Sequence, residues 1–322
     1  MPSNRASPLQ AEFLQLAPAQ VQALSDELAQ GLLQPQPSIA PKFLYDALGS
    51  KLFEAITELD EYYPTRTEAA IFERHRDELA QACGGGHTLV DLGAGNCAKA
   101  ASLFDALRPS RYVAVDISVD FLRRALHELQ SRHPQLPMLG LGTDFSRALE
   151  LPPQAGNGTR LMFYPGSSIG NFAPEAAVEF LRRVRAAAPG GALLIGVDLL
   201  KPAHMLQRAY DDALGVTAAF NLNLLRHVNR LLGSDFDVTQ WRHVAVFDAA
   251  QARVEMHLEA RCDLQVRWPG GRLLRRAGER MHTENACKYS IEGFDALLRR
   301  AGYTRTRCWT DPQGWFAVFV AH

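Results

Sequence analysis

The chain has 322 residues, of which 47% are hydrophobic and 21% charged, so it is long enough to bury a core without disulfides or metals. A formal net charge of −1 argues against wholesale binding to nucleic acid or to an anionic membrane, because both usually need a basic face. Five scattered cysteines without a C-x-x-C pair argue against a disulfide framework or a zinc ribbon and indicate a reducing compartment.

The N-terminal segment, up to about residue 40, is rich in Gln, Ala and Pro and lacks the apolar core of a signal peptide. It predicts one helix, over 20–33, which Pro35 and Pro37 prevent from continuing. No stretch of the chain approaches the roughly 18 uninterrupted apolar residues of a membrane span. These features predict a soluble, cytoplasmic protein that binds no membrane.

Amphipathic helices and apolar strands alternate from residue 66 to residue 200. The strands are expected to begin at residues 87, 111, 138, 160 and 192, with helices at 67–83, 97–107, 119–132 and 174–187. Near-continuous apolar strands separated by such helices predict a parallel sheet covered on both faces. Near the C-terminus we expect a helix over 291–302 and two strands, 303–310 and 315–322, that form an antiparallel hairpin.

The alternation breaks between about 201 and 287. Residues 201–232 predict irregularly polar helices, and residues 238–282 alternate in the manner of antiparallel strands. We therefore predict two domains. The sheet domain comprises 66–200 plus 288–322, and a second α+β domain comprises 1–65 plus 201–287.

The first candidate site is the turn D-L-G-A-G at 91–95, which follows a predicted strand and precedes a helix. Its glycines let a ligand approach the backbone, and the helix N-terminus offers free N–H groups. The third glycine of a dinucleotide fingerprint is missing, so the turn is more typical of methyltransferases that bind S-adenosylmethionine. Asp116 ends the next strand, where a carboxylate can accept from both ribose hydroxyls, and Asp144-Phe145 ends the third, suited to an adenine ring. Because the carboxyl ends of parallel strands meet at one edge, we expect one nucleoside site; unrelated strand-end caps are the plain alternative.

A competing motif, G-x-S-x-G, spans residues 166–170 and would make Ser168 the nucleophile of a serine hydrolase. Candidate acids and bases follow in the chain order that this class requires: Asp198 or Asp212, then His227 or His243. The elbow of such enzymes needs a helix directly after the serine, whereas Pro174 predicts a later helix start. Serine hydrolase is kept as the alternative from another class, beside a protein that binds S-adenosylmethionine without turnover.

Two other features of the sequence lie close to these candidate sites. His282, Glu284 and Cys287 form a conceivable zinc cluster, but a fourth ligand is missing, so no metal is expected. Two tyrosines directly before Pro64 predict a rigid, extended segment, because proline disfavours helical geometry in the residue before it.

Eight runs of sequence occur in the order of a known family: FLYDALGSKLFEAIT, EYYPTRTEAAI, DLGAG, VDIS, PGSSIGNF, AYDDALGVTAAFNLNLL, VEMHL and GERMHTENACKY. Together, over about residues 40–322, they resemble the L-histidine Nα-methyltransferase family, which makes hercynine (trimethylhistidine) on the route to ergothioneine. The resemblance implies a Rossmann-like class I methyltransferase sheet, mostly parallel with an antiparallel last strand, and a second α+β substrate-binding domain. It also implies S-adenosylmethionine as co-substrate, three successive methyl transfers to the α-nitrogen of L-histidine and no metal. We expect a monomer that acts on a free amino acid and binds no nucleic acid.

The resemblance also assigns site residues. The residues that match its contacts to S-adenosylmethionine are Gly93, Lys99, Asp116, Asp144 and Phe145. The residues that match its contacts to the amino acid are Tyr45, Tyr62, Gly166, Asn171, Tyr210, Met256 and Glu284. Tyr45 is implied to be catalytic, as a hydroxyl near the substrate amine, while Met256 and Glu284 frame the imidazole.

Ala286 departs from the family pattern, which has serine two residues after the glutamate. The imidazole would then lack one hydrogen-bond partner, at a cost of about 1–3 kcal/mol, unless water or Asn285 replaces it. Another aromatic or imidazole-bearing amino acid is therefore the alternative substrate.

Overall fold

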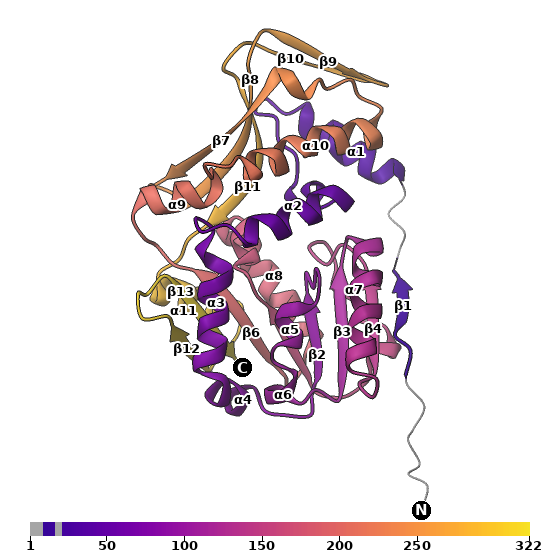
Figure 1. Ribbon diagram of the computed structural model, residues 1–322, viewed down its shortest axis with the longest axis vertical. Helices are drawn as coiled ribbons and strands as arrows, with labels where there is room; N and C mark the ends of the chain where they lie inside the picture. Colours follow the sequence, from indigo (N-terminus) through magenta and orange to yellow (C-terminus); the bar gives the residue numbers. More distant parts are fainter. Residues whose placement is uncertain (1–8, 17–20) are drawn as a thin grey trace, which may run out of the picture.

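The computed structural model describes residues 9–16 and 21–322, in which a large sheet lies beneath a smaller group of strands and helices (Figure 1). The large sheet has the order β1-β4-β3-β2-β5-β6-β13-β12, and its pairs are parallel except β6–β13 and β13–β12. Its strands are β1 (Glu12–Gln15), β2 (Thr88–Leu92), β3 (Arg111–Asp116), β4 (Met138–Gly142), β5 (Arg160–Tyr164), β6 (Ala192–Asp198), β12 (Thr306–Thr310) and β13 (Phe316–Ala321). The predicted α/β fold, with an antiparallel strand at the end of the chain, is confirmed.

Helices cover both faces of this sheet, because its central strands are mostly apolar and every residue of β2, β4 and β6 is buried. One face packs against α8 and α11, and the other against α3, α4, α6 and α7. In α7, Leu122, Leu126 and Leu129 recur every three or four residues and are buried, which is the pattern of a helix lying on a sheet. The helices are α3 (Tyr63–Arg74), α4 (Arg76–Cys83), α5 (Ala98–Ala101), α6 (Phe104–Leu107), α7 (Val119–Arg132), α8 (Pro174–Ala187) and α11 (Ile291–Arg300), with short 3-10 helices η2 (Pro153–Ala155) and η3 (Ser168–Asn171).

The smaller group, at the top of Figure 1, has its own hydrophobic core, whose buried side chains come from residues 28–63 and 206–286. Its three-stranded sheet has the order β11-β8-β7, and β9 and β10 form a separate hairpin. Its elements are α1 (Val21–Leu32), η1 (Pro41–Leu44), α2 (Ala47–Thr57), α9 (Ala203–Tyr210), α10 (Val216–Leu232), η4 (Val238–Gln240), β7 (Trp241–Asp248), β8 (Arg253–Ala260), β9 (Leu264–Trp268), β10 (Gly271–Arg275) and β11 (Arg280–Cys287). The division into two domains stays a prediction, and β1 differs from it, because this strand pairs with β4 of the large sheet.

Three local predictions differ from the structure. The helix expected over 67–83 is two helices, because the backbone leaves helical geometry at His75. Residues 97–107 likewise form the short helices α5 and α6. The segment before Pro64 is not extended: Tyr63 begins α3, where proline is tolerated because first-turn N–H groups need no helical partner. Of the helix expected over 20–33, Gln20 lies outside the described residues.

Candidate active site

The carboxyl ends of β2 to β6 meet at the edge of the large sheet that faces the smaller group, beneath α2 (Figure 1). After β2, Gly93 and Gly95 adopt φ of +73° and +53°, and a Cβ on Gly95 would meet no atom within 4 Å. After β3, the Asp116 carboxylate accepts from the backbone N–H of Gly95 at 2.9 Å and from that of Ser118 at 2.8 Å. The turn and the carboxylate thus lie together, and burial raises the pKa of Asp116.

Asp144 and Phe145 follow β4 at the same edge. Asp144 accepts from Lys42 Nζ at 2.8 Å, and Lys42 also pairs with Glu27 of α1 at 2.8 Å. Phe145 is half-buried and packs against the aromatic rings of Tyr164 and Phe180. The chain before α2 is therefore tied directly to the strand end at which we expect an adenine.

Glu68 of α3, which the sequence analysis did not single out, connects two of the predicted residues. Its carboxylate is fully buried and accepts from Lys99 Nζ at 2.7 Å and from the backbone N–H of Gly166 at 2.7 Å. Gly196 of β6 leaves room for it, since a Cβ there would lie 1.9 Å from Glu68 Oε1. Glu68 stands within the quoted run EYYPTRTEAAI, but only its partners reveal a role.

Aromatic rings form the opposite wall, between η1, α2 and α10. The Tyr45 ring contacts those of Phe53 and Phe220, with centroids 5.6 and 5.5 Å apart. The Tyr62 ring contacts that of Phe53 at 6.1 Å and that of Tyr210 at 6.3 Å. The three predicted substrate tyrosines thus belong to one continuous cluster. Asn171 lies at the end of η3, half-buried.

Glu284 and Met256 are direct cross-strand neighbours of β11 and β8. A bulge between His282 and Glu284 shifts the register, so that His282 pairs with His257 while Glu284 pairs with Met256. A bulge re-aims the side chains that follow it, and here it places Glu284 and Met256 on the same, buried face. Glu284 Oε2 is buried and has no hydrogen-bond partner in the described part of the chain.

The same bulge separates side chains that two sequence-based ideas would bring together. Asn285 lies on the opposite face from Glu284 and Ala286, where its Oδ1 contacts His282 Nε2 at 3.0 Å. It therefore does not take the place of the missing serine hydroxyl. His282 is likewise separated from Glu284, and within residues 9–16 and 21–322 no group of three or more His, Cys, Asp or Glu side chains could hold a metal ion.

The titration of Tyr45 and Glu284 reflects their burial. Burial, followed by the charge of Glu284, holds the pKa of the Tyr45 phenol well above its ordinary value, with Tyr62, Tyr210 and Asp116 adding to the shift. Tyr45 is therefore a neutral phenol near neutral pH, able to accept and donate a hydrogen bond but not to act as a phenolate base. Burial raises the pKa of Glu284 to about 7, against the opposing charge of Lys288.

The serine hydrolase alternative is wrong. Ser168 Oγ donates to the carbonyl of Pro165 at 3.3 Å rather than to a histidine. His227 Nδ1 contacts the carbonyl of Phe43 at 2.8 Å, and both ring nitrogens of His243 contact groups other than Ser168. No catalytic triad is therefore assembled around this serine.

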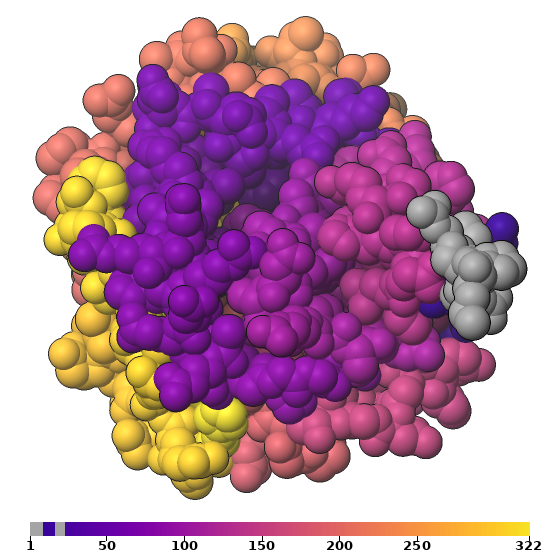
Figure 2. Space-filling view, turned by 60° about the horizontal axis from the view of Figure 1, so that its bottom comes forward, coloured from indigo at the N-terminus to yellow at the C-terminus, as the bar shows by residue number. Residues whose placement is uncertain are grey.

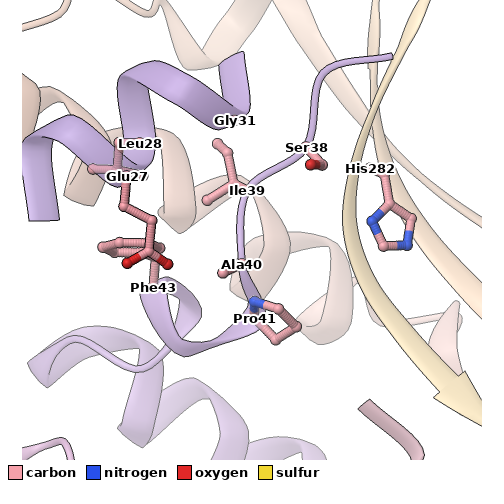
Figure 3. Close-up of a pocket in the computed structure, with 9 residues that line it drawn as sticks. All are labelled: Glu27, Leu28, Gly31, Ser38, Ile39, Ala40, Pro41, Phe43 and His282. Atoms are coloured by element: carbon pink, nitrogen blue, oxygen red, sulfur yellow. The ribbon is translucent and has the colours of Figure 1, made fainter. Parts of the chain in front are cut away.

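The surface is hollowed between the purple N-terminal helices and the magenta residues that follow β2 and β3 (Figure 2). A separate cavity of about 290 Å³ lies beside the 38–41 segment, with α1 and Phe43 on one side and His282 on the other (Figure 3). None of the predicted site residues lines that cavity, so it is distinct from the candidate active site. Among the described helices, none has the length and apolar character needed to cross a membrane.

Comparison with known proteins gives consistent similarities. Residues 24–322 match a family described as histidine-specific, SAM-dependent methyltransferase. The chain is 41% identical over 319 residues to histidine N-alpha-methyltransferase of Mycolicibacterium smegmatis, covering 95% of this chain and 96% of that protein. It is 40% identical over 306 residues to the protein of the same name from Mycobacterium tuberculosis, covering 93% and 94%. It is also 34% identical over 277 residues to Ergothioneine biosynthesis protein 1 of Neurospora crassa, covering 83% of this chain but 31% of that longer protein.

Proposed function

Because the chain belongs to the family of histidine-specific, S-adenosylmethionine-dependent methyltransferases, we propose that it transfers three methyl groups in succession to the α-nitrogen of L-histidine. The product is hercynine, and the reaction is the first step of ergothioneine biosynthesis. The near-neutral charge of −1 and the five free thiols support a cytoplasmic enzyme that acts on small molecules.

The edge of the large sheet fits S-adenosylmethionine. The open space above Gly95 admits a ligand against the backbone, Asp116 would accept from the ribose hydroxyls, and Phe145 would pack against the adenine. Lys99, held by Glu68, would bind the carboxylate of the methionine part, and Asp144 would stand at the adenine edge. When bound, S-adenosylmethionine supplies an electrophilic methyl group on its sulfonium.

The aromatic wall and β11 would hold the amino acid. Glu284, with one unpartnered oxygen, would accept from the imidazole N–H beside Met256. Tyr210, Asn171 and Gly166 would bind the amine and the carboxylate. A free α-amine has a pKa of about 7.7–8.0, so much of it is protonated near neutral pH and unable to attack. Tyr45, a neutral phenol, would accept a hydrogen bond from the unprotonated amine and direct its lone pair, while positioning supplies about 7–11 kcal/mol of the barrier reduction.

One contact carries the proposal, because it joins the two halves of the site. Ser118 donates its backbone N–H to Asp116 at 2.8 Å and its hydroxyl to the carbonyl of Tyr45 at 2.7 Å. The residue expected at the ribose and the residue expected at the substrate amine are therefore held together by one serine. This arrangement supports methyl transfer between two ligands in one cleft.

The test is mass spectrometry of the protein incubated with S-adenosylmethionine and each of the twenty amino acids in turn. We expect only L-histidine to gain mass, through mono-, di- and trimethylated species. A gain on another aromatic amino acid and none on L-histidine would support the alternative substrate. Binding of S-adenosylmethionine by calorimetry without any product would contradict an enzyme altogether.

Ala286→Ser should lower the KM for L-histidine about 3- to 10-fold, since a restored hydroxyl would pair one imidazole nitrogen. Ala286 is buried on the same face as Glu284, two residues further along β11, so an added hydroxyl would lie beside the ring. Steady-state kinetics measure the effect, with Ala286→Cys as a control of similar size and weaker hydrogen bonding. An unchanged KM in Ala286→Ser would show that the hydroxyl does not reach the imidazole.

A further inference from the structure

Lys288, the residue directly after β11, is a buried cation that the sequence analysis did not assign. Its side chain is 1% exposed, and its Nζ lies 2.8 Å from Asp198 Oδ2 and 2.9 Å from the Tyr210 hydroxyl. Burying an ammonium costs several kcal/mol unless other groups compensate it. The contacts of Lys288 with Asp198 and Tyr210 compensate its burial, and they indicate which groups it acts on.

The contact between Lys288 and Tyr210 leaves the O–H group of Tyr210 free to donate a hydrogen bond. Lysine has no acceptor, so Lys288 must donate and the Tyr210 oxygen must accept. The hydroxyl proton of Tyr210 is then directed away from Lys288, and no acceptor for it is found among residues 9–16 and 21–322. Burial holds the pKa of Tyr210 well above its ordinary value, so this proton is retained. A phenol that accepts from a cation is also a stronger donor on its own account.

A second lysine provides the internal comparison. Lys201 Nζ lies 2.6 Å from the other oxygen of Asp198, and its side chain is 2% exposed. It donates as well to the carbonyl of Leu199 and lies over the Tyr63 ring, 4.5 Å from the centroid. Lys201 thus shares the burial and the partner of Lys288 but makes no contact with Tyr210.

The acidic groups around Lys288, Lys201 and Asp198 have partners of their own or act through their charge. Asp198 also accepts from the Tyr63 hydroxyl at 2.7 Å. Asp311 acts on Lys201 through its charge, while its Oδ1 accepts from the backbone N–H groups of Trp315 and Phe316 at 2.8 Å. Glu284 also interacts with Lys288 through its charge. Lys288 is therefore the cation placed between the Asp198 cluster and the tyrosines of the candidate site.

We propose that Lys288 acts through Tyr210 to set the preference for a free amino acid carboxylate over an uncharged amide. The proposal rests on the proposed function, because it assumes that the carboxylate of the amino acid meets the Tyr210 hydroxyl. A carboxylate accepts strongly from a hydroxyl that is itself polarised by a cation, and its negative charge compensates the buried ammonium. A neutral amide supplies neither the charge nor the same acceptor strength. Lys288 is thus a positioning residue rather than a catalytic one.

The experiment compares kcat/KM for L-histidine with kcat/KM for L-histidinamide in the wild-type protein, Lys288→Met and Lys201→Met. Lys288→Met should lower the ratio of the two values about 10- to 100-fold, the loss expected for one charge-assisted interaction. Lys201→Met removes a similarly buried ammonium without touching Tyr210, so the ratio should stay within about twofold of the wild-type value. The stability of this variant should nevertheless fall, because Asp198 loses one of its cationic partners. Any difference in the amine pKa of the two substrates is the same for every variant and cancels.

A merely structural role for Lys288 would lower both activities equally and leave the ratio unchanged, which would overturn the proposal. A ratio that falls equally in Lys201→Met would overturn it as well. If Lys288→Met does not fold, Tyr210→Phe keeps the Lys288–Asp198 pair and must lower the same ratio. Failure of the proposed function looks different, because the wild-type protein would then not methylate L-histidine. The ratio would in that case be measured with the amino acid that it does methylate and the amide of that amino acid.

Discussion

Glu284→Ala should raise the KM for L-histidine about 100-fold, while the Kd for S-adenosylmethionine changes less than about twofold. Glu284 Oε2 is a buried acceptor without a partner, and an imidazole N–H would satisfy it through a charge-assisted hydrogen bond. The residues proposed to bind the cofactor lie at the edge of the large sheet, whereas Glu284 lies in β11 of the three-stranded sheet. Steady-state kinetics give the KM, and calorimetry gives the Kd.

Glu284→Gln is the matched control, because an amide keeps an acceptor of the same length and loses only the charge. We expect its KM to lie between those of the wild-type protein and Glu284→Ala. An equal loss of affinity for S-adenosylmethionine and histidine in Glu284→Ala would indicate general damage to the fold. That outcome would contradict the proposed contact between Glu284 and the imidazole.

The same glutamate predicts how stability depends on pH. Burial raises its pKa from 4.5 to about 7, so between these values the folded protein holds a proton that the unfolded chain releases. The free energy of unfolding therefore falls as pH rises from 4.5 towards 7, by up to about 3 kcal/mol from this group. Glu284→Gln should abolish that part of the fall. Urea titrations of the ligand-free proteins at pH 4.5 and pH 8 would measure the difference.

Glu68→Ala should weaken the binding of S-adenosylmethionine about 10-fold and lower the free energy of unfolding by about 2–3 kcal/mol. The change leaves the Gly166 N–H without its acceptor and releases Lys99, whose side chain is one-third exposed, so that its ammonium can be rehydrated. The stability loss therefore comes mainly from the buried amide, and the affinity loss from the freed lysine. Calorimetry and urea denaturation measure the two effects separately.

Glu68→Gln separates the two contacts. The amide oxygen of the glutamine can still accept from the Gly166 N–H. Its NH₂ group then faces the Lys99 ammonium, and because both groups are donors, no hydrogen bond forms between them. We expect most of the affinity loss of Glu68→Ala with less of its stability loss. If both variants bind S-adenosylmethionine as the wild-type protein does, Glu68 is structural only, and Lys99 does not depend on it.

Local sequence pattern was sufficient for the large sheet apart from β1, and for the sheet edge at which we expect the cofactor. The apolar runs at β2 to β6 alternate with amphipathic helices, and this order predicts a parallel sheet whose carboxyl ends share one edge. Gly93, Asp116 and Asp144 are then neighbours by topology. The residues expected to bind the amino acid came instead from the similarity of quoted runs to one family, since no periodicity marks Tyr45 or Tyr62.

Only the tertiary structure revealed the partners of these residues. The bulge before Glu284 reverses the alternation of β11 and separates Glu284 from His282, which strict alternation would place on one face. Glu68 and Gly166 are 98 positions apart, and Lys288 and Tyr210 are 78 apart. A local pattern reflects the period of a helix or a strand and the chemistry of its nearest neighbours. Contacts between distant segments depend on how whole elements pack, and a single extra residue in a strand changes which side chains meet.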